Sequence, residues 1–412
     1  MKPRLLVLGG GIIGLACAYA AQRRGWSVTL VEPGELGGQA SGAAAGMLAP
    51  FTENPDQPDD FFRLCQDSLQ RYPAWLEELE RATGIEVQYR RTGSLSLALH
   101  EADLLHLRAR WRWQTAWGAR AELLDGAQLR RLEPQLGAAA IAALYSPAES
   151  HVYAPLLVQA LELACRGAGV RLIAQAGAIS GPEPGYGHER IGLSGGETLT
   201  ADKVLVCAGA WTTDYAAALG LRLPVHPIRG QICAYRMTPG TIRHMLFSSQ
   251  AYWVEKANGT LVCGASEDVA GYDTRVTARG IDRLVRVTPR LLPQLEGAEP
   301  AHRWAGLRPA TVDGRPLLGP VPGRPRVLVA AGHYRNGILL APATAEAIAE
   351  LLEEREPALP LADFAPGRFA RGASSFTHGA SSAQAPSGGA PSGEVSSAHA
   401  SSGDASSGRH GV

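Results

Sequence analysis

The first 32 residues alternate between short apolar runs and a segment with apolar residues at helical spacing. Leu5 to Leu8 has the pattern of a buried strand, the segment that begins near Ile12 has that of an amphipathic helix, and a second apolar run ends in Glu32. A glycine-rich turn separates the first strand from the helix. The order strand, turn, helix, strand is typical of a unit that binds a dinucleotide.

The turn contains a Gly-x-Gly-x-x-Gly motif made of Gly9, Gly11 and Gly14. In this motif the first glycine permits the tight turn, the second lets the backbone approach a pyrophosphate, and the third lets the helix pack closely on the sheet. Glu32 follows Gly9 by 23 residues, close to the interval at which an acid accepts hydrogen bonds from an adenosine ribose. The alternative is a glycine-rich turn in an unrelated α/β protein, but here every part occurs in order.

The rest of the chain alternates between the same two patterns. Residues 33–50 form a long loop of small residues, which can follow an extended ligand with its backbone N–H groups. We expect a helix over Asp59 to Thr83 that ends at Gly84, strands within 85–99, and helical structure over 101–132. Beyond these, the pattern predicts a helix and a strand over 152–174, a strand and a helix over 199–220, strands over 224–264 with turns at Gly230, Pro239 and Gly259, and a strand, a turn and a helix over 327–352.

This alternation predicts an α/β (α+β) fold with two domains, each discontinuous in sequence. A Rossmann-like nucleotide-binding domain is expected from residues 1–84, 149–220 and 302–367. A substrate domain built on an antiparallel sheet is expected from residues 85–148 and 221–301. Residues 368–412 are rich in Ala, Ser, Gly and Pro, so we expect a disordered low-complexity tail without activity.

Composition limits the classes of partner. The formal net charge is +0, which gives no reason to expect a nucleic acid or an anionic membrane as partner. The six cysteines are scattered and include no Cys-x-x-Cys pair, as expected of reduced thiols that pack in the core of a cytoplasmic protein. The N-terminal apolar run resembles a secretory signal, but cleavage near Ala18 would remove the glycine motif. We therefore expect a soluble protein with an intact N-terminus, no membrane span and no metal site.

Three longer motifs support a resemblance to a known family. They are residues 45–50 (AGMLAP), residues 306–309 (GLRP) and residues 332–342 (GHYRNGILLAP). With the glycine motif, they make residues 4–360 resemble the FAD-dependent D-amino-acid oxidase superfamily, and within it the glycine oxidases of thiamine biosynthesis. The resemblance implies an FAD-binding domain in place of a generic nucleotide-binding one. It also implies a homotetramer.

The resemblance also implies roles for individual residues in binding FAD. Ile12 and Ile13 would lie at the pyrophosphate, Glu32 and Pro33 at the adenosine ribose, and the backbone of Ala178 at the adenine. The remaining cofactor contacts that the resemblance implies are Ala40 and Ser41 along the phosphates, Ala45, Gly46 and Met47 at the isoalloxazine, and His333, Tyr334, Arg335, Asn336, Gly337, Ile338 and Leu339 at the pyrimidine side of the flavin. No cysteine lies beside Arg308 or within residues 332–338, so we expect FAD to be held noncovalently.

Arg308 and Arg335 are the main candidates for binding substrate. A guanidinium group can bind the planar carboxylate of an amino acid through two parallel hydrogen bonds, and the resemblance places both arginines at the substrate. Tyr252 matches a tyrosine that faces the substrate in related enzymes, although an aromatic residue on a strand is as often part of the core. Met47 is a candidate wall of a small pocket. Glu267 stands where the family leads us to expect an apolar residue, which leaves the substrate preference open.

These residues lead to a hypothesis of FAD-dependent oxidative deamination of glycine and of small amines such as sarcosine or D-alanine. Hydride transfer to flavin N5 would give an imino acid or glyoxylate, with ammonia, while O₂ would be reduced to H₂O₂. No side chain is nominated as a catalytic base. The resemblance implies that the imine supplies thiazole formation for thiamine. The alternatives are a sister sarcosine or D-amino-acid oxidase, a dehydrogenase with another acceptor, and a flavin-binding protein without turnover.

Overall fold

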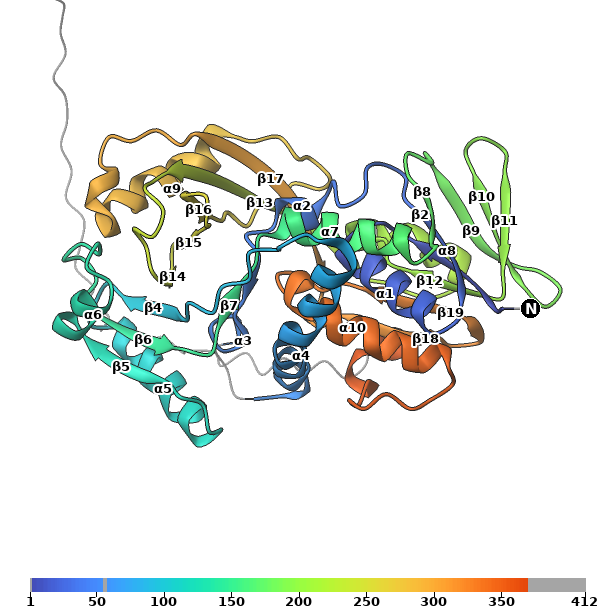
Figure 1. Ribbon diagram of the computed structural model, residues 1–412, viewed down its shortest axis with the longest axis horizontal. Coiled ribbons are helices and arrows are strands. Elements are labelled where there is room, and N and C mark those ends of the chain that lie inside the picture. Colours follow the sequence, from blue (N-terminus) through green and yellow to red (C-terminus); the bar gives the residue numbers. More distant parts are fainter. Residues whose placement is uncertain (1, 55–57, 370–412) are drawn as a thin grey trace, which may run out of the picture. The chain divides into compact units, whose positions relative to one another are not determined.

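The computed structural model describes residues 2–54 and 58–369, which belong to one compact unit spanning residues 1–371. Most of the predicted tail, from residue 370 onward, lies outside the described residues. The unit is built on two large sheets that lie at its opposite ends in Figure 1. This mixed α/β architecture confirms the predicted fold class.

The smaller of these sheets has six strands, and all neighbouring strands are parallel except the first two in the order below, which are antiparallel. Its strand order is β18 (Leu317–Val321), β19 (Arg324–Ala331), β12 (Lys203–Val206), β1 (Arg4–Leu8), β2 (Ser27–Val31) and β8 (Arg171–Ile173). Strand β1 is buried on both faces, since Leu5 and Val7 belong to one core cluster and Leu6 and Leu8 to another. A continuous apolar run is therefore the correct pattern for this strand.

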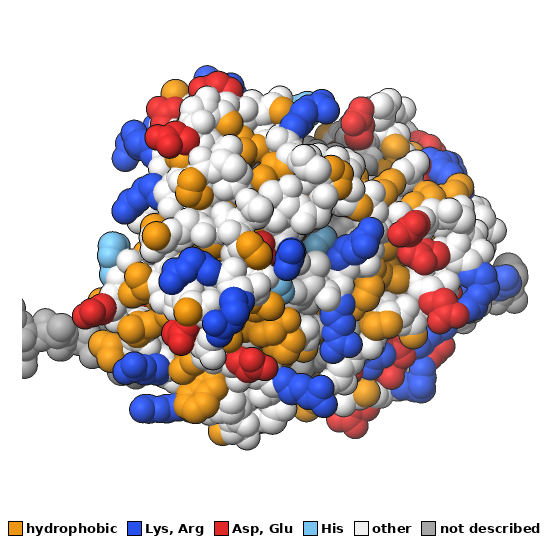
Figure 2. All heavy atoms as spheres, turned by 60° about the vertical axis from the view of Figure 1, so that its left-hand side comes forward, with side chains coloured by type: hydrophobic (Ala, Val, Ile, Leu, Met, Phe, Trp, Pro, Cys, Tyr) orange, Lys and Arg blue, Asp and Glu red, His pale blue; other side chains and the backbone are white. Residues whose placement is uncertain are grey.

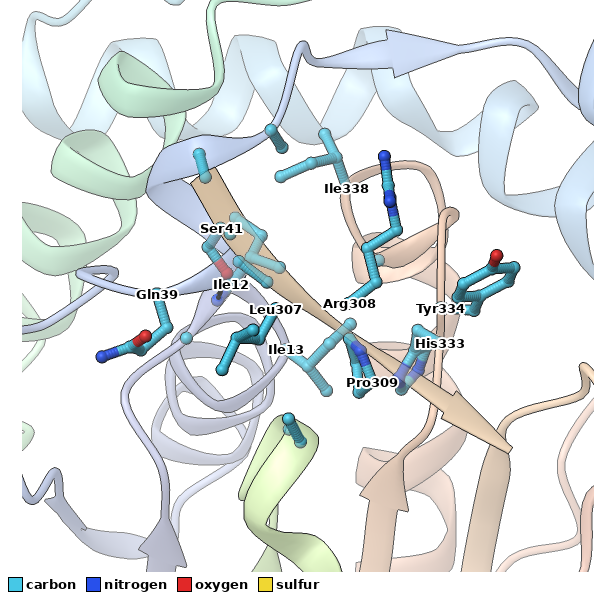
Figure 3. A pocket seen from close by; sticks show the side chains of 18 of the residues that line it. Ile12, Ile13, Gln39, Ser41, Leu307, Arg308, Pro309, His333, Tyr334 and Ile338 are labelled. Atoms are coloured by element: carbon cyan, nitrogen blue, oxygen red, sulfur yellow. Dashed lines mark hydrogen bonds between the residues drawn. The ribbon is translucent and has the colours of Figure 1, made fainter. Parts of the chain in front are cut away.

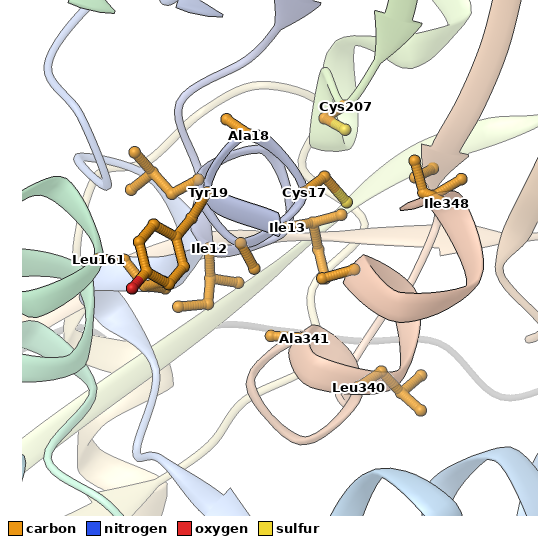
Figure 4. Close-up of a cluster of buried hydrophobic side chains, with 14 of the residues drawn as sticks. Ile12, Ile13, Cys17, Ala18, Tyr19, Leu161, Cys207, Leu340, Ala341 and Ile348 are labelled. Atoms are coloured by element: carbon orange, nitrogen blue, oxygen red, sulfur yellow. The ribbon is translucent and has the colours of Figure 1, made fainter. Parts of the chain in front are cut away.

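Helices cover one face of the six-stranded sheet. They are α1 (Ile12–Arg23), α4 (Asp60–Thr83), α7 (Ala154–Gly167) and α10 (Gly337–Leu352). Figure 4 shows α1 between two of them, with Tyr19 beside Leu161 of α7 and Ile13 toward Ala341 of α10. Gly14 lies on another side of α1, against the ends of β1 and β12, because a Cβ atom there would collide with the carbonyl oxygen of Gly9 and touch Cys207. This contact agrees with the expectation that the third glycine lets the helix pack closely on the sheet.

A small antiparallel sheet and two short helical segments cover the other face. The sheet contains β9 (Ile179–Pro184), β10 (Glu189–Leu193) and β11 (Thr198–Ala201). The helical segments are η1 (Gly209–Tyr215) and α8 (Ala216–Leu219). The prediction of a strand followed by a helix over 199–220 is therefore confirmed, although the helical part begins as a 3₁₀ helix and becomes an α-helix only at Ala216.

The larger sheet has eight strands and is antiparallel except where β14 (Met245–Phe247) lies parallel to β4 (Ser94–Ala98). Its order is β17 (His302–Thr311), β13 (Val225–Arg236), β16 (Thr260–Gly264), β15 (Tyr252–Glu255), β14 (Met245–Phe247), β4 (Ser94–Ala98), β6 (Ala142–Ser146) and β5 (Glu122–Asp125). Helix α9 (Ala278–Leu291) packs on one face of this sheet. Strand β17 pairs with β13 along its whole length, so residues 302–311 join the larger sheet and not the smaller one. The division into two domains otherwise stays a prediction.

Three predictions of local structure were wrong. Residues 85–89 form no strand, and only Ser94–Ala98 of that segment does. The segment 101–132 is not continuously helical, because β5 separates α5 (Asp103–Ala116) from α6 (Gly126–Leu132), where Asp125 forms a capping box. Gly230 is not a turn residue but lies inside β13.

The helix predicted over residues 59–83 is confirmed, with Asp59 as N-cap and Gly84 as left-handed C-cap. The remaining elements are short: α2 (Ala40–Ala43), α3 (Pro50–Glu53), η2 (Pro293–Leu295), η3 (Ala362–Phe364), η4 (Pro366–Phe369), and the paired strands β3 (Met47–Leu48) and β7 (Ser150–His151). All six cysteines are buried free thiols, which confirms their packing role.

The described surface carries both signs of charge. Figure 2 shows one face on which Lys and Arg side chains are interspersed with Asp and Glu. This agrees with a chain that holds 39 basic and 39 acidic residues. In the described part of the chain no helix is both long enough and apolar enough to cross a membrane.

Candidate active site

A pocket of about 510 Å³ lies at the carboxyl ends of the parallel strands and extends to β17 of the larger sheet. Residues directly after β1, β2, β12 and β19 line it, as expected for a ligand site in an open parallel sheet. In Figure 3 Arg308 extends from β17, with Ile12, Ile13 and Ser41 to one side and His333 and Tyr334 to the other. Most of the lining residues are small or apolar.

The first part of the pocket is the turn that precedes α1. Gly11 is the N-cap of this helix in an extended conformation, and the N–H of Ile12 donates to the Ser41 hydroxyl at 2.9 Å. First-turn N–H groups of a helix have no partner within the helix, so they favour an anion at this end. The Glu32 carboxylate accepts from the backbone N–H of Gly10 at 2.7 Å and from that of Gly34 at 2.9 Å. These bonds fix the carboxylate at the pocket wall.

The small-residue loop forms a second wall, and one buried lysine holds it. The Lys256 ammonium group donates to the carbonyl of Ala45 at 2.6 Å and to that of Val152 at 2.9 Å, and it lies 3.4 Å from the His151 ring. Burial lowers the pKa of Lys256 to about 7. Met47 follows in the same loop and pairs with His151 through β3 and β7. Lys256 thus fixes the loop on the side away from the pocket, and no motif in the sequence indicates this contact.

Arg308 lies in the pocket without a carboxylate partner. Its Nη1 donates to the carbonyl of Ser266 at 3.0 Å, and among the described residues it forms no ion pair. Its guanidinium group lies against Gly230 of β13, where an added Cβ would fall 2.5 Å from Cζ. A glycine inside a strand often marks a place where another group approaches closely. Gly230 therefore provides the space that Arg308 occupies.

Arg335 differs from Arg308 because two carboxylates bind it. Its Nε and Nη2 donate to the two oxygens of Glu53 at 2.6 Å and 3.1 Å, and its Nη1 donates to Glu267 at 2.7 Å. The negative charge of Glu53 raises the pKa of Arg335 further above its usual value. Tyr334 also donates to Glu267, at 3.0 Å. The sequence analysis predicted neither of these two ion pairs of Arg335.

Two further groups in the pocket are neutral at physiological pH. Tyr252 is buried and faces the pocket, whereas Trp253 on the opposite face of β15 belongs to the core under α9. Burial raises the pKa of Tyr252 to about 12, an effect that the charges of Arg308 and Arg335 oppose. Burial also lowers the pKa of His333 to about 3, and its Nε2 lies 3.1 Å from the Thr344 hydroxyl. Tyr252 is thus available as a hydrogen-bond donor, while His333 is poorly suited to carry a proton.

The pocket brings together most of the residues that the sequence singled out. Those that line it are Gly9, Gly11, Ile12, Ile13, Glu32, Pro33, Ala40, Ser41, Ala45, Gly46, Met47, Tyr252, Arg308, His333, Tyr334, Arg335, Asn336, Gly337 and Ile338.

Three predicted cofactor residues do not line this pocket. Gly14 packs α1 against the Gly9 turn, and Leu339 is fully buried in the core. Ala178 is exposed, and its carbonyl accepts from the N–H of Ser194 at 3.0 Å. The predicted backbone contact of Ala178 with an adenine stays a prediction.

Sequence reasoning missed the segment from Cys207 to Trp211, which lines the pocket directly after β12. The general rule that ligand sites lie beyond the carboxyl ends of parallel strands would have found it. It also missed Glu53, Gly230 and Gln39. No local signal marks Glu53, since its partner Arg335 lies 282 residues away in sequence.

Comparisons with known proteins agree with this geometry. Residues 4–351 match the family model DAO, described as FAD dependent oxidoreductase. The chain is 35% identical over 361 residues to a glycine oxidase of Geobacillus kaustophilus, an alignment that covers 87% of this chain and 95% of the relative. It is 34% identical to the bifunctional protein ThiO/ThiG of a Synechocystis species, covering 89% of this chain and 54% of that protein.

A comparison of structures gives the same result. The crystal structure of glycine oxidase from Geobacillus kaustophilus matches with a TM-score of 0.85 and 33% sequence identity. The match covers 89% of this chain and 99% of that chain.

Proposed function

Because the chain belongs to the DAO family of FAD dependent oxidoreductases, we propose that it oxidises the amine of small neutral amino acids, with glycine as the favoured substrate. The relatives named glycine oxidase support glycine. The observation that carries the proposal is Arg308, a guanidinium group without an ion-pair partner among the described residues, at a pocket lined largely by apolar side chains. Such a group binds a carboxylate strongly, because little water competes for it.

The residues of the pocket fit FAD. The start of α1 offers N–H groups to the phosphates, and Glu32, fixed by two backbone bonds, suits a ribose hydroxyl. The loop of Ala45 to Met47 and the turn before α10 are the segments we propose to hold the flavin ring. The start of α10 points its positive end into the same pocket, which would stabilise negative charge there. When bound, FAD supplies the oxidant that accepts a hydride from the substrate.

The protein's own groups then bind and orient the amino acid. Arg308 holds the α-carboxylate, and Tyr252 donates a hydrogen bond from the buried side. Met47 and Ile232 provide apolar walls that exclude water and leave room for a small side chain. No group of the pocket is required as a base if the amine binds unprotonated. The products we expect are an imino acid, which hydrolyses to glyoxylate and ammonia, and H₂O₂ from O₂ as electron acceptor.

The ThiO part of the Synechocystis relative's name supports a place in thiamine biosynthesis, where the imine from glycine would supply thiazole formation. A cytoplasmic location and a homotetramer remain predictions from the sequence.

An anaerobic titration of the purified yellow protein tests the proposal. Glycine, sarcosine and D-alanine are each added without oxygen, and bleaching of the flavin absorbance is followed. Oxygen is then admitted and peroxide is assayed. We expect bleaching by glycine at the lowest concentration, followed by recovery of the absorbance with one peroxide per turnover.

The same titration separates the alternatives. Bleaching that oxygen does not reverse would indicate a dehydrogenase with another acceptor, such as a quinone. Preference for sarcosine or D-alanine would indicate a sister oxidase. Absence of bleaching with every amine would indicate a flavin-binding protein without turnover and would refute the proposed activity.

A further inference from the structure

Three charged side chains from distant parts of the chain form one cluster at the pocket that contains Arg308. Glu53 ends α3, Glu267 follows β16, and Arg335 belongs to the turn before α10. Glu53 and Arg335 both line the pocket. The Glu53 side chain is 7% exposed and that of Glu267 is 47% exposed, so Glu267 is the member on the solvent side.

The two carboxylates use the hydrogen-bonding face of Arg335. Glu53 takes both Nε and Nη2, and Glu267 takes Nη1, so the planar fork that would bind a carboxylate in two places is already occupied. The three groups carry one positive and two negative charges. Arg335 together with its partners therefore presents a net negative charge, whereas Arg308 remains a cation without a carboxylate partner in the described structure.

Hydrogen bonds fix the two residues that flank Glu267 in the sequence, Ser266 and Asp268. The carbonyl of Ser266 accepts from Arg308, and the Ser266 hydroxyl donates to the Asp268 carboxylate at 2.8 Å. The backbone of Asp268 exchanges two hydrogen bonds of 2.9 Å with that of Arg229. Although burial alone would raise the pKa of Glu267, the charge of Arg335 and the bonds from Tyr334 and Arg335 lower it, so this carboxylate is ionised at neutral pH.

We propose that Glu267 determines substrate specificity, because it takes the Nη1 that Glu53 leaves on Arg335 and adds a negative charge there, so that the pocket accepts amines with one carboxylate and rejects those with a second. This inference rests on the proposed function. The single carboxylate is neutralised by Arg308. A second carboxylate on the amine nitrogen would find no free guanidinium group, and it would meet the negative charge of Glu267. Like charges brought close together in a site sheltered from water repel strongly.

The test compares ligands that differ in the second carboxylate. Methoxyacetate has the shape of sarcosine and oxydiacetate has the shape of iminodiacetate, and neither contains an oxidisable amine. Their dissociation constants are measured by calorimetry with the FAD-loaded wild type and with Glu267→Gln, which keeps the side chain's size and removes its charge. Glu267→Asp keeps the charge. Glu77→Gln is the matched control, because Glu77 forms an exposed ion pair with Arg81 on α4 and does not line the pocket.

We expect the wild type to bind methoxyacetate at least about tenfold more tightly than oxydiacetate, and Glu267→Gln to reduce that preference by about tenfold. Glu267→Asp and Glu77→Gln should leave it close to the wild-type value. In turnover, kcat/KM for iminodiacetate relative to sarcosine should rise in Glu267→Gln by a similar factor.

A preference that is the same in the wild type and in Glu267→Gln would overturn the inference. So would wild-type binding of both ligands with equal affinity. If no amine is oxidised but the preference between the two ligands changes as described, the proposed function fails and the charge-based selection stands. The two ideas therefore fail in distinguishable ways.

Discussion

At the scale of single residues, Arg308 carries the proposed binding of substrate. Removal of its guanidinium group in Arg308→Ala should raise KM for glycine by about 100-fold, because a charge-assisted bidentate contact in a sheltered pocket is lost. Bound flavin should be retained, since the groups proposed to hold it lie elsewhere in the pocket. Steady-state kinetics and the ratio of flavin to protein measure the two effects. Unchanged kinetics would remove Arg308 from the site.

Gly230 provides a second prediction at this scale. Its backbone is not in the left-handed region, so Gly230→Ala is compatible with the strand, but the added methyl group would lie 2.5 Å from the Arg308 guanidinium. We expect KM for glycine to rise by about tenfold as Arg308 shifts, while the melting temperature changes little. Gly259→Ala does not serve as control, because Gly259 has a φ of 77°. Gly167→Ala does, since a Cβ there meets open space. An unaltered KM in Gly230→Ala would show that Arg308 tolerates the methyl group.

At the scale of elements, the buried Lys256 joins β15 to the loop that carries Ala45. The pKa of Lys256 is about 7 in the folded protein and about 10.4 in the unfolded chain, so the unfolded state binds more protons between these values. The free energy of unfolding should therefore rise with pH across this window, by about 2 kcal/mol between pH 7 and pH 9. Chemical denaturation of the wild type and of Lys256→Met at several pH values measures it. The variant should lack this rise, and parallel curves for the two proteins would contradict the assignment.

The helices and strands also show which parts of the fold could be predicted from the sequence. Period and capping signals were sufficient for α4, because it buries one apolar face and ends at Gly84. Helices α1 and α10 were recognised from the glycine-bearing turn before each of them, although both are buried around most of their surface. Period and capping signals failed between residues 101 and 132, where the short strand β5 is fixed by pairing with β6 and not by its own four residues. Gly230 was misread as a turn for a related reason. Its role is set by the side chain of Arg308, which reaches Gly230 only once β13 and β17 have paired with Arg308 opposite Ile228.

At the scale of the whole molecule, the pocket joins segments that lie far apart in sequence. Residues after β1, β2 and β19 were predicted to line it, whereas Cys207 to Trp211 after β12 were missed, although the carboxyl ends of parallel strands meet at one edge of a sheet. The Glu53–Arg335–Glu267 cluster could not, because its members come from three segments whose approach depends on how both sheets pack. Most residues that line the pocket could therefore be predicted from the sequence. The ion pairs that some of them form, such as those of Arg335, could not.

The last prediction concerns the residues beyond the compact unit. The sequence of residues 372–412 contains few large apolar side chains, so its removal should leave flavin content, kcat/KM for glycine and melting temperature unchanged. Truncation after Arg371 keeps the ion pair between Arg368 and Asp313 and the buried side chain of Phe364. Truncation after Leu361 is the contrasting variant and should lower the melting temperature by roughly 5 °C, since it removes both. Acid precipitation of each protein should release all of the flavin, as expected of a noncovalent cofactor. Loss of flavin or of activity in the variant that ends at Arg371 would show that the tail contributes to the site.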